Sequence, residues 1–248
     1  MPQVPHEAHG EAAPENSFIL KPNSVCRILG TIALLLIFAD LAGQLFCHYT
    51  GDYRPRTIIK LFNLDRESNV PSSFSAFLLL AASALLAVIT VLEKRRQSPG
   101  IFHWTLLAAG FLGMAFDELC SLHEKLVAPL QALLGGRYLG IFYFAWVLPG
   151  GLLVLGLGLL FIRFLWVLPP KTRVAFIAAG VTYVGGAIGM ESVGGLHVES
   201  HGRNNLSYAF LVVLEEGLEM AGAILFLRAL LNYLSDNFGE VRLRFSRR

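Results

Sequence analysis

The chain has 248 residues, of which 54% are hydrophobic and 15% are charged, and its formal net charge is +2. Its mean hydropathy is clearly positive, at +0.57. A soluble domain of this length rarely has such a composition, and the apolar runs leave no room for a separate soluble domain of any size.

Six stretches of the chain are long and apolar enough to cross a bilayer as helices. A hydrocarbon core of about 30 Å requires roughly 20 apolar residues in an α-helix. The runs are too long for barrel strands, and no strand pattern is evident. The predicted fold is therefore an all-α integral membrane bundle of about six transmembrane helices. The predicted helices cover residues 26–48, 73–93, 101–122, 138–166, 173–195 and 206–233.

The two ends of the chain differ from this predicted transmembrane domain, residues 26–233. Residues 1–25 are polar and rich in Pro, Glu and His, which predicts a flexible tail, whereas residues 234–248 form a basic tail. Lysine and arginine are more numerous in the tails and in the turns 94–100 and 167–173 than in the other connections. The positive-inside rule then predicts that both termini are cytoplasmic, in a bacterial inner (plasma) membrane. We interpret the basic tail as a membrane anchor, so that the lipid bilayer, and not nucleic acid, is the expected partner. The sequence leaves the oligomeric state open.

Three glutamates interrupt the last apolar run. Glu215, Glu216 and Glu219 lie within residues 206–233 and span an arc of about 100° on a helix. A single acid at the centre of a transmembrane helix costs about 3 kcal/mol on the insertion scale. The three carboxyl groups must therefore be protonated, face a cation or line water.

Acidic residues recur in the outer half of three other predicted helices. Asp117 shares a helix face with Gly110 and Gly113, Glu191 shares one with several glycines, and Asp40 lies on the first helix. Small residues let helices approach closely, so the glycine-bearing faces are predicted to point inward. We therefore expect a polar cavity that opens outward. A loop is predicted after residue 195, and it carries two of the histidines near the cavity. The cavity is surrounded by Asp40, Asp117, Glu118, Glu124, Glu191, Glu215, Glu216 and Glu219, with His123, His197 and His201 near its rim.

The leading hypothesis for this cavity is a metal site. Packed carboxylates repel one another, and a divalent cation removes that conflict. Carboxylates together with imidazoles suit iron, zinc or manganese, although the sequence lacks the Glu-x-x-His motif of ferritin-like di-iron proteins. In a metalloenzyme, Glu219 or Glu124 would be the base and the substrate would be lipid-like or periplasmic. The predicted ligands are Asp117, Glu118, His123, Glu124, Glu191, His197, His201, Glu215, Glu216 and Glu219.

Two other interpretations stay open at this point. Acids inside a membrane mark proton and cation paths, and Glu219 near mid-depth would suit a protonation switch in a transporter or channel. No comparable acid is evident in the cytoplasmic half of any predicted helix, which speaks against a complete path. Alternatively, the protein is structural and its acids are protonated or hydrogen-bonded between helices, which is sufficient for Asp40 or Glu118 taken alone.

The segments FLGMAFDELCSLHEKL and LEEGLEMAG carry a resemblance to known proteins. Together they resemble a group of bacterial multi-pass membrane proteins with an Asp-Glu-x4-His-Glu helix end and a later Glu-Glu-x-x-Glu helix. The likeness covers roughly residues 100–230. It implies a membrane bundle and the location of a site, but neither a reaction nor a metal. The matching residues are Asp117, Glu118, His123, Glu124, Glu215, Glu216 and Glu219.

Overall fold

The computed structural model describes residues 21–51, 57–136 and 139–239, so most of both predicted tails lies outside the described part. Every regular element in this part is helical and none is a strand, which confirms the all-α prediction. The α-helices are α1 (Pro22–Thr50), α2 (Thr57–Phe62), α3 (Val70–Arg95), α4 (Ile101–Cys120), α5 (Leu122–Leu133), α6 (Val147–Val167), α7 (Pro170–Val184), α8 (Glu191–His201) and α9 (Leu206–Phe238). A short 3₁₀ helix, η1, covers Gly140–Phe142, and a π-helix, η2, covers Gly185–Met190.

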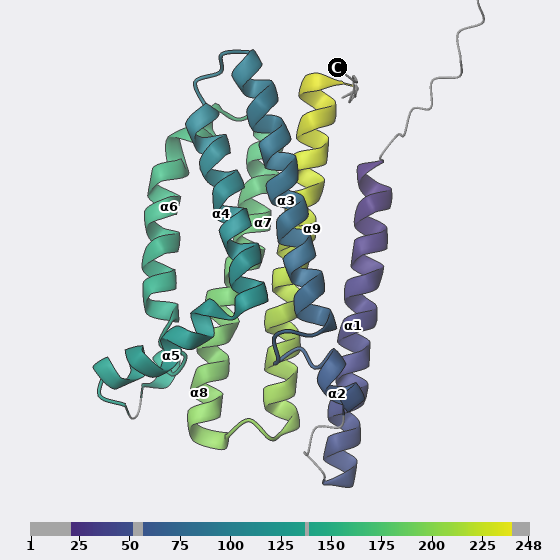
Figure 1. Ribbon diagram of the computed structural model, residues 1–248, viewed down its shortest axis with the longest axis vertical. Helices are drawn as coiled ribbons and strands as arrows, with labels where there is room; N and C mark the ends of the chain where they lie inside the picture. Colours follow the sequence, from purple (N-terminus) through teal and green to yellow (C-terminus); the bar gives the residue numbers. More distant parts are fainter. Residues whose placement is uncertain (1–20, 52–56, 137–138, 240–248) are drawn as a thin grey trace, which may run out of the picture.

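The long helix α9 packs against α1, α3 and α7, while α4 packs along α3 and α6 contacts α7 and η2 (Figure 1). The side chains of Leu78, Leu86, Ile89, Trp104 and Leu230 are almost fully buried between these helices. Both α2 and α5, together with the turn from α8 to α9, lie at one end of the bundle (Figure 1), which we call the α2–α5 end. The end of α9 lies at the other end of the bundle.

Fewer helices than predicted qualify as membrane spans by length and composition. Four are long and apolar enough within the described residues: α1, α3, α6 and the continuous run Pro170–His201. A fifth is added if α4 and α5, which are bent by 77° relative to each other, are counted as one span. The predicted sixth span, α9, is not among them; it is surrounded by other helices and carries three glutamates.

The predicted helix 101–122 ends early, at Cys120. Ser121 has left-handed backbone angles (φ 51°, ψ 46°), which an α-helix cannot continue through. The chain then restarts as α5, a helix that the sequence pattern did not predict. His123 and Glu124 therefore lie on α5 and not at the end of the preceding helix.

Two other predicted boundaries are also wrong. The predicted helix 138–166 begins only at Val147, because Gly140 adopts a positive φ and a 3₁₀ turn follows it. The predicted helix 173–195 extends to His201, and the chain leaves it at Gly202, whose φ is +73°. Much of the expected loop after residue 195 is therefore helical.

Candidate functional site

Acidic side chains from four parts of the chain meet in the half of the bundle nearer the α2–α5 end. They come from the loop before α3, from α4, from α8 and from α9. Electrostatic interactions link them in an unbroken series, with Glu118 interacting with Glu67 on one side and with Glu216 and Glu219 on the other. The carboxylate cluster, as we call it, consists of Glu67, Asp117, Glu118, Glu191, Glu215, Glu216 and Glu219.

His123 connects α5 to the cluster through both ring nitrogens. Its Nδ1 lies 2.7 Å from Oδ2 of Asp117, and its backbone N–H donates to Oδ1 of Asp117 at 2.9 Å. Its Nε2 lies 3.4 Å from Oε1 of Glu67, whose other oxygen accepts a hydrogen bond from the Ser121 hydroxyl. Burial raises the pKa of Glu67, and the nearby carboxylates of Glu124 and Asp117 add to this, against the opposing effects of Ser121 and His123.

Glu191 is held by an indole and by a second carboxyl group. The Trp146 Nε1–H donates to Oε1 of Glu191 at 2.8 Å, and the Trp146 ring lies 4.9 Å from the ring of His123. The Glu215 carboxyl group on α9 interacts electrostatically with Glu191. Glu191 therefore links the start of α8 both to Trp146, before α6, and to α9.

Glu219 approaches α7 through a very close helix contact. Its carboxyl group interacts electrostatically with Tyr183. A Cβ atom added at Gly222 would lie 2.6 Å from the backbone nitrogen of Tyr183, and one added at Gly186 would lie 2.6 Å from the carbonyl oxygen of Glu215. Because such distances exclude a side chain, glycine at these two positions lets α7 and η2 bring their backbones against α9.

Three of the predicted ligands lie outside the cluster. Glu124 is exposed on α5, although it interacts electrostatically with Glu118 and so lies at the rim. His197 and His201 stack on each other at 4.8 Å, and Nε2 of His197 lies 2.9 Å from Oδ1 of Asn205. Both histidines line a separate, largely apolar groove between α8 and the start of α9. The structure therefore does not bring them to the carboxylates.

Asp40 also lies apart from the cluster. Only 3% of its surface is exposed, and its Oδ1 accepts a hydrogen bond from Gln44 at 3.1 Å. It also interacts with the backbone of Leu64 and with Asp65, in the segment between α2 and α3. Asp40 thus belongs to the contact between α1 and this segment, and not to the wall of the cavity predicted from the sequence.

The cluster has one pair of side chains spaced as two ligands of a metal ion would be. Within the described part of the chain, no group of three or more His, Cys, Asp or Glu residues is arranged to hold a metal ion. However, Nε2 of His123 and Oε1 of Glu67 are 3.4 Å apart, and two ligands with bonds of about 2.0–2.1 Å stand about 3.4 Å apart at a tetrahedral angle. Asp117 on the other nitrogen is the partner that typically orients a metal-bound imidazole.

Sequence reasoning missed Glu67, Trp146 and Tyr183, all of which contact the predicted residues. A signal for Glu67 was present. Asn69 and Ser72 form a capping box, in which Oδ1 of Asn69 accepts from the Ser72 N–H at 3.1 Å and Oγ of Ser72 accepts from the Asn69 N–H at 3.0 Å. Recognising this helix start would have placed Glu67 at the α2–α5 end. Trp146 and Tyr183 carry no comparable signal, because they reach the cluster only through tertiary packing.

Stacked aromatic rings separate the cluster from the other end of the bundle. Phe226 of α9 stacks on Phe111 of α4 at 4.6 Å and packs against Phe176 of α7 at 4.8 Å. Beyond this aromatic layer, the Tyr233 hydroxyl donates to the buried carboxylate of Glu93 at 2.9 Å. The expectation that the opposite half of the bundle lacks an acid is therefore wrong, but the aromatic layer lies between that acid and the cluster.

Residues 28–234 match the profile of a family described as "Domain of unknown function (DUF8692)". This match covers most of the chain and includes every residue of the carboxylate cluster. No curated protein and no solved structure matches the chain. The chain therefore belongs to the DUF8692 family of domains.

Proposed function

We propose that this protein is a multi-pass membrane protein of the bacterial inner membrane, with about six spans and both termini in the cytoplasm. In this proposal α9 is the sixth span, and the carboxylate cluster binds a divalent metal ion, which is iron, zinc or manganese. The observation that carries the proposal is the gathering of seven carboxyl groups around one imidazole inside an apolar bundle. Such a set is stable only with protons or a cation among the carboxylates.

His123 and Glu67 are the first ligands that we assign. Their 3.4 Å spacing suits a shared ion, and Asp117 would hold the imidazole in the required orientation. Glu118 is the adjacent carboxylate and would complete the donor set. A bound metal would polarise a substrate or a water molecule. Glu219 would then serve as the base, with Glu124 at the rim, and a lipid-like or periplasmic substrate would enter from the α2–α5 end.

The aromatic layer favours this one-sided site over a transport path. A proton or cation path would need polar groups or water across the whole bundle. Between Glu219 and Tyr233, however, the buried residues of α9 are apolar or glycine, and Phe226 is packed between two other helices. Transport is therefore the second candidate, and the experiment below distinguishes it.

The proposal predicts that the purified full-length protein retains about one or two equivalents of iron, zinc or manganese. The protein is prepared in mild detergent without chelators, and metals are measured by elemental analysis. His123→Gln and Glu67→Gln should each lose most of the metal, because each removes a ligand while nearly preserving side-chain size. Asp236→Asn is the matched control, since Asp236 is exposed near the end of α9 away from the cluster.

Lowering the pH should release the metal, because ligands must be deprotonated to bind. Since burial raises the pKa of Glu67, protons should compete for it at a higher pH than for an exposed glutamate. If the native protein binds no metal even after incubation with each of the three ions, the metal proposal is wrong. Proton and cation flux in liposomes would then test the transport candidate.

A further inference from the structure

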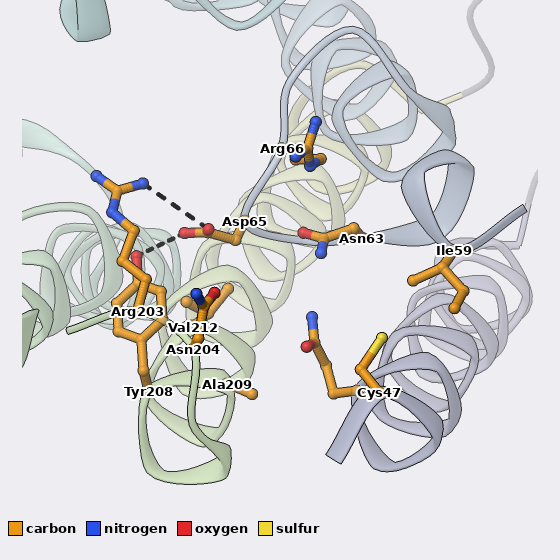
Figure 2. Close-up of a pocket in the computed structure, with 11 residues that line it drawn as sticks. Cys47, Ile59, Asn63, Asp65, Arg66, Arg203, Asn204, Tyr208, Ala209 and Val212 are labelled. Carbon is orange, nitrogen blue, oxygen red and sulfur yellow. Dashed lines mark hydrogen bonds and ion pairs between the residues drawn. The ribbon is translucent and has the colours of Figure 1, made fainter. Parts of the chain in front are cut away.

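A polar cavity lies at the α2–α5 end, apart from the carboxylate cluster, where α1, α2 and the start of α9 meet (Figure 2). Its volume is about 300 Å³, at the small end of the range for small-molecule sites. Its walls come from segments far apart in the sequence. They include Asn63, Asp65, Arg66, Arg203, Asn204 and Tyr208.

Among the described residues that line this cavity, two carry guanidinium groups and one carries a carboxylate. Asp65 accepts a hydrogen bond from the Tyr208 hydroxyl and lies 3.8 Å from a guanidinium nitrogen of Arg203 (Figure 2). Arg203 also lies over the ring of Phe144, at 5.1 Å. Asp65 thus fixes Arg203 in place, while about half of the Arg203 side chain stays accessible.

Arg66 supplies the second positive charge. Its guanidinium makes no side-chain hydrogen bond or ion pair within residues 21–51, 57–136 and 139–239, and it is exposed at the cavity. The side-chain amide of Asn204 likewise has no hydrogen bond to any other described residue. The N-terminus of the 33-residue helix α9 begins two residues later, at Leu206, and adds the positive end of its dipole. The cavity therefore offers several unused donors and a net positive potential.

We propose that this cavity binds the phosphate of a phosphorylated head group. Guanidinium groups bind phosphate oxygens through paired hydrogen bonds. A phosphate has enough oxygens to engage Arg66 and Arg203 together, whereas a single carboxylate has enough oxygens for the paired hydrogen bonds of only one guanidinium group. The lining also includes the apolar side chains of Ile59 on α2 and of Ala209 and Val212 on α9, which suit the carbon portion of a phosphate ester. The ligand is either a phospholipid head group or a soluble phosphate ester, and the two share this chemistry.

This inference is independent of the metal proposal. Tyr208 stands between the two sites. Its hydroxyl contacts Asp65 in the cavity. On the other side, the Tyr208 ring and a carboxylate oxygen of Glu215 both lie near Gly194, each about 3.9 Å from where a Cβ of that residue would be. Neither Arg66 nor Arg203 has a contact with His123 in the described part of the chain. Because Arg203 interacts electrostatically with Glu191 of the carboxylate cluster, metal content is measured for each arginine variant, and loss of phosphate binding with metal retained distinguishes this inference from the metal proposal.

The test uses the full-length protein in a phosphate-free maltoside detergent and isothermal titration calorimetry. Three probes are compared: dihexanoylphosphatidylglycerol, glycerol 3-phosphate and phosphate-free dihexanoylglycerol. The variants are Arg66→Gln and Arg203→Gln, with Arg163→Gln as the matched control because Arg163 is exposed on α6 and does not line the cavity. Thermal unfolding of each variant verifies that it is folded. Arg66→Gln removes no hydrogen bond and so keeps the test decisive if Arg203→Gln is unstable.

We expect at least one phosphorylated probe to bind, and both arginine variants to weaken its binding about tenfold or more, with no change in the control. Tighter binding of phosphatidylglycerol than of glycerol 3-phosphate would identify a lipid ligand, and similar affinities would identify a soluble one. The proposal is overturned if neither phosphorylated probe binds, if Arg66→Gln binds them as tightly as the native protein, or if the phosphate-free probe binds equally well.

Discussion

Some glycines allow the helices around the cluster to approach closely, whereas other glycines in the same bundle do not lie at helix contacts. Sequence analysis expected the glycine-bearing acidic faces of the predicted helices 101–122 and 173–195 to point inward, against other helices. In the structure, Gly186 and Gly222 have neighbouring atoms where a Cβ would stand, whereas Gly110 and Gly113 have nothing within 4 Å. The sequence pattern is the same in both cases, because it records the absence of a side chain and not the distance to the next helix.

Gly222→Ala should therefore destabilise the protein by about 1–3 kcal/mol, the usual cost of overpacking. Its added methyl group would meet the backbone of Tyr183, which cannot move without displacing α7. Gly217→Ala on the same helix is the matched control, because its Cβ would meet only a side-chain carbon of Ile37 at 3.6 Å. Chemical unfolding in detergent measures both. Equal stability of the two variants would contradict the close contact.

At the scale of elements, the sequence predicted helix identity well and helix ends poorly. The cores of all six predicted helices are helical, because long apolar runs are a strong signal. The break at Ser121 was missed, since neither glycine nor proline marks it. The consequence for the site is large: α5 leaves α4 at an angle of 77° and places His123 against Asp117, a contact that depends on this break.

Helix α8 shows the opposite error, because part of it is helical where a loop was predicted. The contacts of Glu199 explain why this segment is ordered as a helix. This residue falls within the loop that was predicted after residue 195. In the structure, its two carboxylate oxygens accept hydrogen bonds from the backbone N–H groups of Leu139 and Gly140, at 2.7 and 2.8 Å. Glu199 thus ties α8 to the segment that precedes α6. No local pattern encodes this bond, because its partners are about 60 residues away.

Glu199→Gln should lower the stability of the protein by about 1–3 kcal/mol, because an amide presents one acceptor where two backbone donors require two. Its metal content should stay unchanged, since Glu199 is not a member of the carboxylate cluster. Thermal unfolding and elemental analysis of the same preparation measure both quantities. Metal loss without a change in stability would show instead that Glu199 is a ligand.

At the scale of the whole molecule, the bundle has two unlike halves. One contains the carboxylate cluster and the phosphate-binding cavity, and the other contains the aromatic packing and the bond between Glu93 and Tyr233. Acids on separate helices predicted that the carboxyl groups of α4, α8 and α9 gather in the first half, but they predicted neither Glu67 nor the cavity lined by Arg66 and Arg203. The second half was missed. Glu93 lies beside the basic residues of a helix end, so the sequence indicates a surface group, whereas in the structure Tyr233 covers it.

This division predicts one-sided access to the cluster. In a background in which Cys26, Cys47 and Cys120, all free thiols, are replaced by alanine, Glu216→Cys should react with a membrane-impermeant thiol reagent added to the outer side only. Ser235→Cys, on the same helix, should react from the cytoplasmic side only. The two positions are about 28 Å apart along α9, which is close to the thickness of a bilayer core.

Each labelling pattern has a distinct meaning for the function. Labelling of Glu216→Cys from both sides would mean that the aromatic layer opens, and it would favour a transport path over a one-sided metal site. Labelling of both positions from the same side would show that α9 does not span the membrane. The expected pattern, with opposite sides for the two cysteines, requires α9 to cross the bilayer with its glutamates facing outward. In that arrangement a substrate reaches the cluster without passing the aromatic side chains of Phe111, Phe176 and Phe226.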